Sequence, residues 1–234
     1  MAERVTAGPV GAWERFGAGP LSLAAAFVYH LLVVELLLLA TAGPGLALLV
    51  LLDRDASNLP LVAALAVPVG PALSAGLYAL HHRRLDLADL RPWALFWRGY
   101  RLNARGVLPL WVAGLAWLTV LAVSLANFSA TGLPGWWAGL LVLVAVPAML
   151  WLLNALVITS LFAFRTRDVA RLAAYFLART PGATLGNAAL LVVAAGAVLF
   201  SSEAVLALLG SLMVLALLGN CRRLIAVVRE EFVA

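Results

Sequence analysis

Six long apolar stretches, separated by short charged segments, constrain this 234-residue chain more than any other feature. Hydrophobic residues make up 65% of the chain and charged residues only 12%, whereas soluble domains are about half apolar and about a quarter charged. So few charges cannot cover a surface that faces water, which indicates that most of the exterior faces lipid. The apolar stretches cover residues 21–52, 59–80, 107–127, 136–164, 185–200 and 204–218.

These stretches predict an all-α polytopic bundle of about six transmembrane helices in a single membrane domain over residues 1–234. A helix needs about 20 residues to cross about 30 Å of hydrocarbon. We expect Gly43-Pro44-Gly45 to interrupt the first stretch and Ser201-Ser202-Glu203 to separate the last two. A single helix over residues 185–218 would be about 50 Å long. That length favours two short crossings joined by a tight turn.

The distribution of arginine predicts the orientation. All 16 basic residues are arginine, and 15 of them lie before the first stretch, between the second and third, between the fourth and fifth, or after the sixth. Only Arg54 lies on the opposite side, where Asp53, Asp55 and Glu203 also lie. The positive-inside rule therefore predicts that both termini are cytoplasmic. The absence of lysine in a chain rich in Ala, Leu and Gly indicates a GC-rich bacterial genome.

A cleaved signal peptide is the alternative for the N-terminus. Ala40-Thr41-Ala42 resembles a cleavage site that follows a leucine-rich run. However, the run is long and contains Glu35, which favours a retained first span.

The segment FWRGYRLNARG (residues 96–106) concentrates charge and aromatic surface between the second and third stretches. On a helical wheel, one stripe consists of Trp93, Phe96, Trp97 and Tyr100. A neighbouring stripe consists of Arg91, Arg98, Arg101 and Arg105. With Asp89 as a cap and Pro92 in the first turn, we predict an amphipathic helix in the cytoplasmic interface. Its rings would enter the headgroup region and its guanidinium groups would contact anionic phospholipid.

This helix serves either as an anchor or as a docking surface. Gly99 offers a flat spot where another backbone could approach, and Asn103, off the arginine stripe, is placed to bond a neighbouring helix end. A similar pattern at residues 168–179, ended by Thr180-Pro181-Gly182, predicts a second interfacial helix.

Two short motifs resemble the YesL-like bacterial membrane proteins, a family of unknown function. The first is PVGPALSAGLYAL (residues 68–80), and the second is the arginine–aromatic segment that follows it. The matching residues are Gly70, Ala72, Leu77, Tyr78, Phe96, Arg98, Tyr100, Arg101 and Asn103. Gly76 stands where the family usually has Ala, and the segment 53–58 looks like an addition. The resemblance implies an inner-membrane protein often encoded near carbohydrate uptake genes, and it carries no catalytic residues to transfer.

A polar site inside the bilayer is predicted from Glu35, His30, Gly70 and Pro71. A carboxylate within a span costs about 2.5–3.5 kcal/mol, so Glu35 should face protein or water. Pro68 and Pro71 open the backbone of the second span, and we expect protonated Glu35, or a water beside it, to bond the freed carbonyl groups. Glu35→Gln should then be tolerated better than Glu35→Leu. Alternatively, these residues form a proton or substrate site.

The sequence favours binding over catalysis. It contains no phosphate-binding loop, only three histidines (His30, His81 and His82) and one cysteine, so we expect no metal or cofactor. The arginines at the membrane edges suit phospholipid better than nucleic acid. The leading hypothesis is a non-catalytic accessory or partner subunit linked to solute, and through the resemblance carbohydrate, uptake. It would contact anionic lipid and either a protein partner or a second copy of itself. The alternative is a small proton-coupled secondary transporter that uses Glu35.

Overall fold

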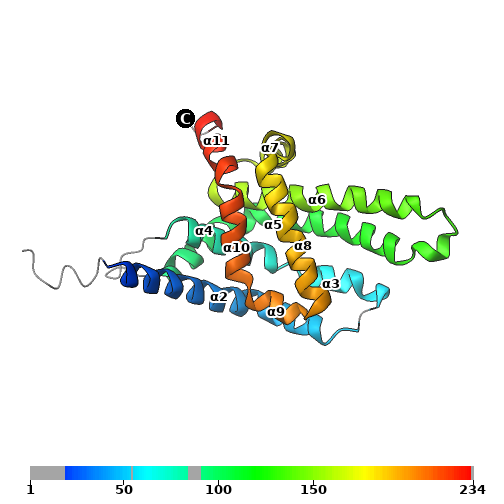
Figure 1. Ribbon diagram of the computed structural model, residues 1–234, viewed down its shortest axis with the longest axis horizontal. Helices are drawn as coiled ribbons and strands as arrows, with labels where there is room; N and C mark the ends of the chain where they lie inside the picture. The colour runs from blue at the N-terminus through cyan, green and yellow to red at the C-terminus, as the bar shows by residue number, and fades with distance from the viewer. Residues whose placement is uncertain (1–18, 54, 84–90, 233–234) are drawn as a thin grey trace, which may run out of the picture.

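The computed structural model describes residues 19–53, 55–83 and 91–232, and in these residues every regular element is a helix (Figure 1). The predicted all-α fold is thereby confirmed. The helices are α2 (Pro20–Val50), η1 (Ala56–Asn58), α3 (Leu59–Leu65), α4 (Val69–His81), α5 (Pro92–Ala126), η3 (Phe128–Thr131), α6 (Trp136–Leu161), α7 (Thr166–Arg179), α8 (Pro181–Phe200), α9 (Glu203–Leu208), α10 (Gly210–Asn220) and α11 (Arg222–Phe232).

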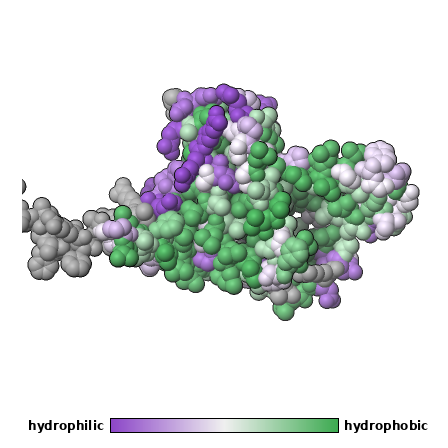
Figure 2. Space-filling view, viewed as in Figure 1, coloured by the Kyte–Doolittle hydropathy of each residue, from purple (hydrophilic) through white to green (hydrophobic). Residues whose placement is uncertain are grey.

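The surface of the bundle is that of a multi-pass membrane protein. Helices α2, α5, α6 and α8 are each long and apolar enough to cross a bilayer. The pairs α3–α4 and α10–α11 qualify as bent spans, with bends of 44° and 53°, which gives four to six crossings. Large apolar side chains such as Leu36, Leu143 and Val192 point outward. Figure 2 shows green surface over most of the molecule and purple gathered at the top, over α7 and α11.

The first span contains no interruption at Gly43-Pro44-Gly45, so that expectation was wrong. Helix α2 runs through Pro44 without a break over 31 residues. The small residues there allow close packing, since a Cβ on Gly45 would lie 2.6 Å from the carbonyl oxygen of Leu65. The segment therefore brings the end of α3 against α2.

The second span is broken where the prolines predicted a disturbance. Helix α3 ends at Leu65, α4 begins at Val69, and the two axes differ by 44°. The indole Nε1 of Trp111 donates a hydrogen bond of 3.0 Å to the carbonyl oxygen of Ala66. A tryptophan from α5 thus satisfies a backbone group at the break, which lipid cannot do.

The predicted separate interfacial helix at residues 91–105 does not exist. This segment forms the first four turns of α5, a continuous helix of 35 residues, or about 52 Å. The prediction failed because the aromatic stripe faces protein in part: Phe96 is fully buried in the core. The cap predicted at Asp89 lies outside the described residues.

Helices α4 and α5 pack antiparallel at close range. A Cβ on Gly99 would lie 2.6 Å from Cβ of Tyr78, and Gly70, near the other end of α4, faces the ring of Trp111. The side chain of Tyr78 therefore packs against the flat spot predicted at Gly99. These contacts fix the rotation of α5 about its own axis.

The second half of the chain follows the sequence more closely. The amphipathic segment predicted at residues 168–179 is the separate helix α7, and Thr180 marks its end. Ser201 and Ser202 separate α8 from α9, as predicted. The final predicted span, 204–218, differs: it is divided into α9 and α10 at Leu209. Figure 1 shows α8 and α10 running across the direction of α2 and α6.

Substitution of Gly99 tests the α4–α5 contact. Gly99→Ala would force a methyl group into Tyr78, and we expect a loss of about 1–3 kcal/mol in the free energy of unfolding. Gly139→Ala in α6 is the control, because its Cβ would meet nothing within 4 Å and alanine favours helix. Thermal unfolding in detergent micelles measures both. Equal midpoints would contradict the close contact.

Candidate functional site

Glu35, on α2, holds the beginning of α10. Its Oε2 accepts a hydrogen bond of 2.6 Å from the backbone N–H of Ser211, the second residue of that helix. The first N–H groups of a helix have no partner within it, and a carboxylate is stabilised there by the helix dipole. The side chain therefore caps a helix 176 residues away in sequence.

The predicted partner of Glu35 was wrong. We expected the carboxyl group to bond the opened backbone of the second span, but that backbone is bonded by Trp111. The physical role is the same, because in both cases a polar side chain satisfies a backbone group at a helix junction. The signal in the sequence was Gly210-Ser211 within an apolar run, which is typical of a helix boundary.

The other carboxylate oxygen of Glu35, Oε1, lacks the kind of partner that Oε2 has. Among the described residues, Oε1 has no hydrogen-bond partner, although it is shielded from solvent. A Cβ placed on Gly210 of α10 would lie 3.3 Å from this oxygen. Buried polar atoms normally have a hydrogen-bond partner, so this oxygen is an exception among the described residues.

The structure does not bring the four predicted intramembrane residues together. Gly70 and Pro71 are buried in α4, and Gly70 packs against Trp111. His30 is also buried, and its Nδ1 lies 3.1 Å from the carbonyl oxygen of Ala26 in its own helix. Glu35 therefore acts apart from the other three.

An apolar cavity of about 370 Å³ lies between α2, α4, α8, α9 and α10. Its lining includes Leu38, Leu73, Leu190 and Met213, and it also includes Gly210, which contacts Glu35. Glu203 is its single charged lining residue among those described. The space nearest to Glu35 is thus shaped for apolar groups.

The predicted arginine stripe lies on the outer side of α5. Arg98, Arg101 and Arg105 are exposed, as are Trp93 (57%) and Trp97 (37%). Phe96, between them in sequence, is 0% exposed. We call Trp93, Trp97, Arg98, Arg101 and Arg105 the arginine–aromatic face.

Hydrogen bonds near the arginine–aromatic face connect α5 to α6 and α6 to α4. Asn103 donates a hydrogen bond of 3.0 Å to the carbonyl oxygen of Ser160, near the C-terminal end of α6, as predicted for a neighbouring helix end. The hydroxyl of Ser160 in turn bonds the hydroxyl of Ser74 in α4 at 2.8 Å. Three helices are therefore tied together beneath the face.

A cleft of about 450 Å³ adjoins the arginine–aromatic face. Arg91 and Arg98 line it together with His30, Tyr78 and His82. The sequence had assigned His30 to a site with Glu35, but the structure places it beside the arginines. Tyr78 and His82 were missed as lining residues, because the turn of α4 that faces α5 could not be deduced from spacing alone.

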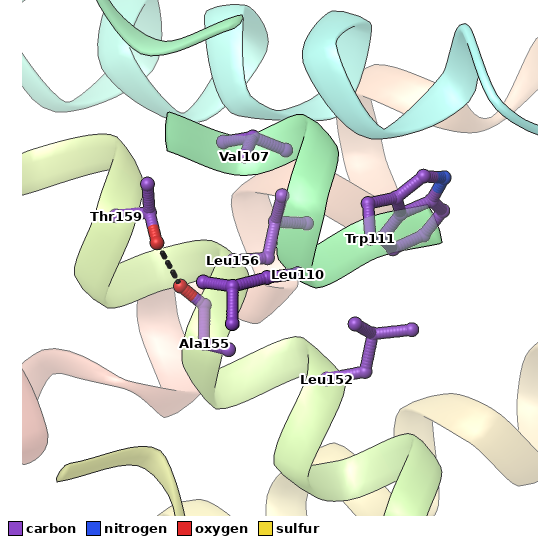
Figure 3. A pocket seen from close by; sticks show the side chains of 7 residues that line it. All are labelled: Val107, Leu110, Trp111, Leu152, Ala155, Leu156 and Thr159. Atoms are coloured by element: carbon purple, nitrogen blue, oxygen red, sulfur yellow. Dashed lines mark hydrogen bonds between the residues drawn. The ribbon is translucent and has the colours of Figure 1, made fainter. Parts of the chain in front are cut away.

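The contact between α5 and α6 is a packing interface. Figure 3 shows Val107 and Leu110 of α5 beside the labelled side chains of α6, while the ring of Trp111 points away from them. The hydroxyl of Thr159 donates to the carbonyl oxygen of Ala155 in its own helix at 2.8 Å. A hydroxyl that is satisfied within its own helix can lie in this apolar contact without leaving an unpaired donor.

A buried chain of polar side chains joins the second half of the bundle. Asn187 of α8 donates to Oδ1 of Asn154 in α6 and also contacts Sγ of Cys221, both at 3.4 Å. Asn154 donates to the carbonyl oxygen of Ala173 in α7. Asn154 therefore links α6 to both α7 and α8 through side-chain hydrogen bonds.

Comparison with known proteins finds no match to a family model, to a curated protein or to a solved structure.

Substitutions at Glu35 test its capping role. Glu35→Leu removes the acceptor and leaves the Ser211 N–H unsatisfied, so we expect a loss of about 1–3 kcal/mol in the free energy of unfolding. Glu35→Gln keeps an acceptor oxygen and should lose less than about 1 kcal/mol. The midpoint of thermal unfolding in detergent compares them. A Leu variant as stable as the Gln variant would rule out the cap.

Proposed function

We propose that this chain is a non-catalytic accessory subunit that docks a membrane-associated partner through the arginine–aromatic face. The observation that carries the proposal is that Arg98, Arg101 and Arg105 are exposed beside two exposed tryptophans on one side of α5. Burial of Phe96 and the contact of Gly99 with Tyr78 hold that display in place.

The chemistry of the face suits an anionic protein surface. Arginine presents a planar fork that binds carboxylate or phosphate with two parallel hydrogen bonds. Tryptophan and arginine are the residue types that dominate binding energy at protein interfaces. Because the face belongs to a helix held by two neighbours, little conformational entropy is lost when a partner binds.

Cellular location and process belong to the same proposal. The concentration of arginine near α4, α5, α7 and α11 supports a cytoplasmic placement of the face in a bacterial inner membrane. The resemblance to YesL-like proteins supports a link to solute uptake, with carbohydrate as the solute class. Anionic phospholipid would surround the face at the membrane boundary.

Charge reversal tests the docking proposal. Arg98→Glu, Arg101→Glu and Arg105→Glu together should reduce co-purification of a stoichiometric partner from native membranes at least about tenfold, because like charges then meet across the interface. The control carries the same reversal at Arg165, Arg167 and Arg171, which are also exposed. The proposal fails if both triple variants retain the partner equally.

Labelling tests the orientation. The native thiol of Cys221 is buried, so the unsubstituted chain gives the background. In intact cells a membrane-impermeant maleimide should label Ala130→Cys, in the loop between α5 and α6. Arg167→Cys, on α7, should react only after permeabilisation. The opposite pattern would invert the proposed topology.

A proton-coupled transporter is the second candidate, and buried Oε1 of Glu35 is the observation that favours it. A carboxyl group that gains and loses a proton inside the bilayer can couple proton movement to solute movement. In proteoliposomes, Glu35→Gln should then abolish solute uptake driven by a pH gradient while the thermal stability remains near that of the native chain. Uptake by the Gln variant would eliminate this candidate.

A further inference from the structure

A second basic cleft, separate from the arginine–aromatic face, lies where the end of α4 meets α10 and α11. It measures about 500 Å³. Four basic side chains line it: His81, Arg83, Arg222 and Arg229. The sequence did not indicate that they form one site, because more than a hundred residues separate Arg83 from Arg222.

The local structure fixes these groups in position. Arg222 and Arg229 are seven residues apart on α11, so they project from one face of the helix. Arg83 bonds the carbonyl oxygen of Leu80 at 2.7 Å through one of its N–H groups, and its guanidinium lies 5.3 Å from the ring centre of Phe27. A guanidinium has five N–H donors, so Arg83 keeps donors for a ligand.

The charge in the cleft is unbalanced. No acidic side chain among the described residues lines it. Glu231, on the same helix, is directed to Arg179 at 3.9 Å instead. Arg229 donates toward Nε2 of His81 at 3.4 Å, so even this contact is between basic residues.

The positive charges in the cleft lie close enough to affect one another. Burial, and to a lesser extent the neighbouring Arg222 guanidinium, lower the pKa of Arg83 below its usual value. Two guanidinium groups that repel one another are stabilised when an anion lies between them.

The floor of the cleft is apolar. Leu80, Leu218, Ile225 and Ala226 line it beneath the basic groups. A ligand that suits both parts has an anionic head and a less polar remainder. Phosphate esters have this character, and arginine is the residue that binds phosphate with two hydrogen bonds at once.

We propose that this cleft is a binding site for a phosphate ester, with Arg83, Arg222 and Arg229 as the ligands of the phosphate oxygens. The ester has two sources, a phospholipid headgroup at the membrane boundary or a soluble phosphate ester from the cytoplasm. The site uses no residue of α5, so it stands independently of the docking proposal.

The test uses the full-length protein in nanodiscs. One arm measures retention of phosphatidylglycerol by native mass spectrometry, starting from phosphatidylcholine nanodiscs doped with phosphatidylglycerol. The other arm measures binding of glycerol 1-phosphate in pure phosphatidylcholine nanodiscs by calorimetry. The variant is Arg222→Gln with Arg229→Gln. The matched control is Arg223→Gln with Arg171→Gln, since both residues are exposed and lie outside the cleft lining.

We expect the variant to bind at least about tenfold more weakly than the control, because each charge-assisted hydrogen bond contributes about a factor of ten. An effect on phosphatidylglycerol alone identifies a lipid site, and an effect on glycerol 1-phosphate identifies a soluble ligand. Either result supports the proposal. Equal binding by variant and control in both arms overturns it. If the double variant does not fold, Arg229→Gln alone, compared with Arg223→Gln alone, gives the same decision.

Discussion

The close antiparallel contact between α4 and α5 is the interaction on which the rest of the bundle depends. Within lipid, helices gain little from burying apolar surface, so association depends on small residues that let helices approach and on hydrogen bonds between them. Gly70 and Gly99 provide the close approach, one at each end of the contact. Trp111 adds the hydrogen bond to the broken backbone between α3 and α4. The break, the rotation of α5 and the outward display of its arginines follow from this one contact.

Polar side chains in the interior form hydrogen bonds that connect separate helices. Glu35 caps α10, Trp111 satisfies the break after α3, and Asn187 links Asn154 to Cys221. Each of them joins elements that are distant in sequence, because a polar group in a low-dielectric interior must find a partner wherever the fold provides one. The unbonded Oε1 of Glu35 is the departure from this rule among the described residues. That departure is why the same side chain supports both a structural role and the second candidate function.

The sequence predicted the class of fold and the break near Pro68, since these depend on composition and backbone chemistry alone. The predictions from sequence were wrong or incomplete where tertiary packing determines the structure. The stripe at residues 93–100 predicts a helix but does not show where that helix ends, and in the structure it continues without a break into the span. The partner of Glu35 and the meeting of Arg83 with Arg222 and Arg229 involve residues more than a hundred positions apart. Spacing within a single helix carries no information about such pairs.

The continuity of α5 has a mechanical consequence. Between Pro92 and Ala126 the helix has no joint at which movement could be absorbed, even at Pro109. Because α5 is continuous, a movement of the arginines at one end tilts or rotates the whole helix. The residues at the other end then move with it. A partner bound at the arginines can therefore shift the residues near Ala126, at the opposite end of the same helix.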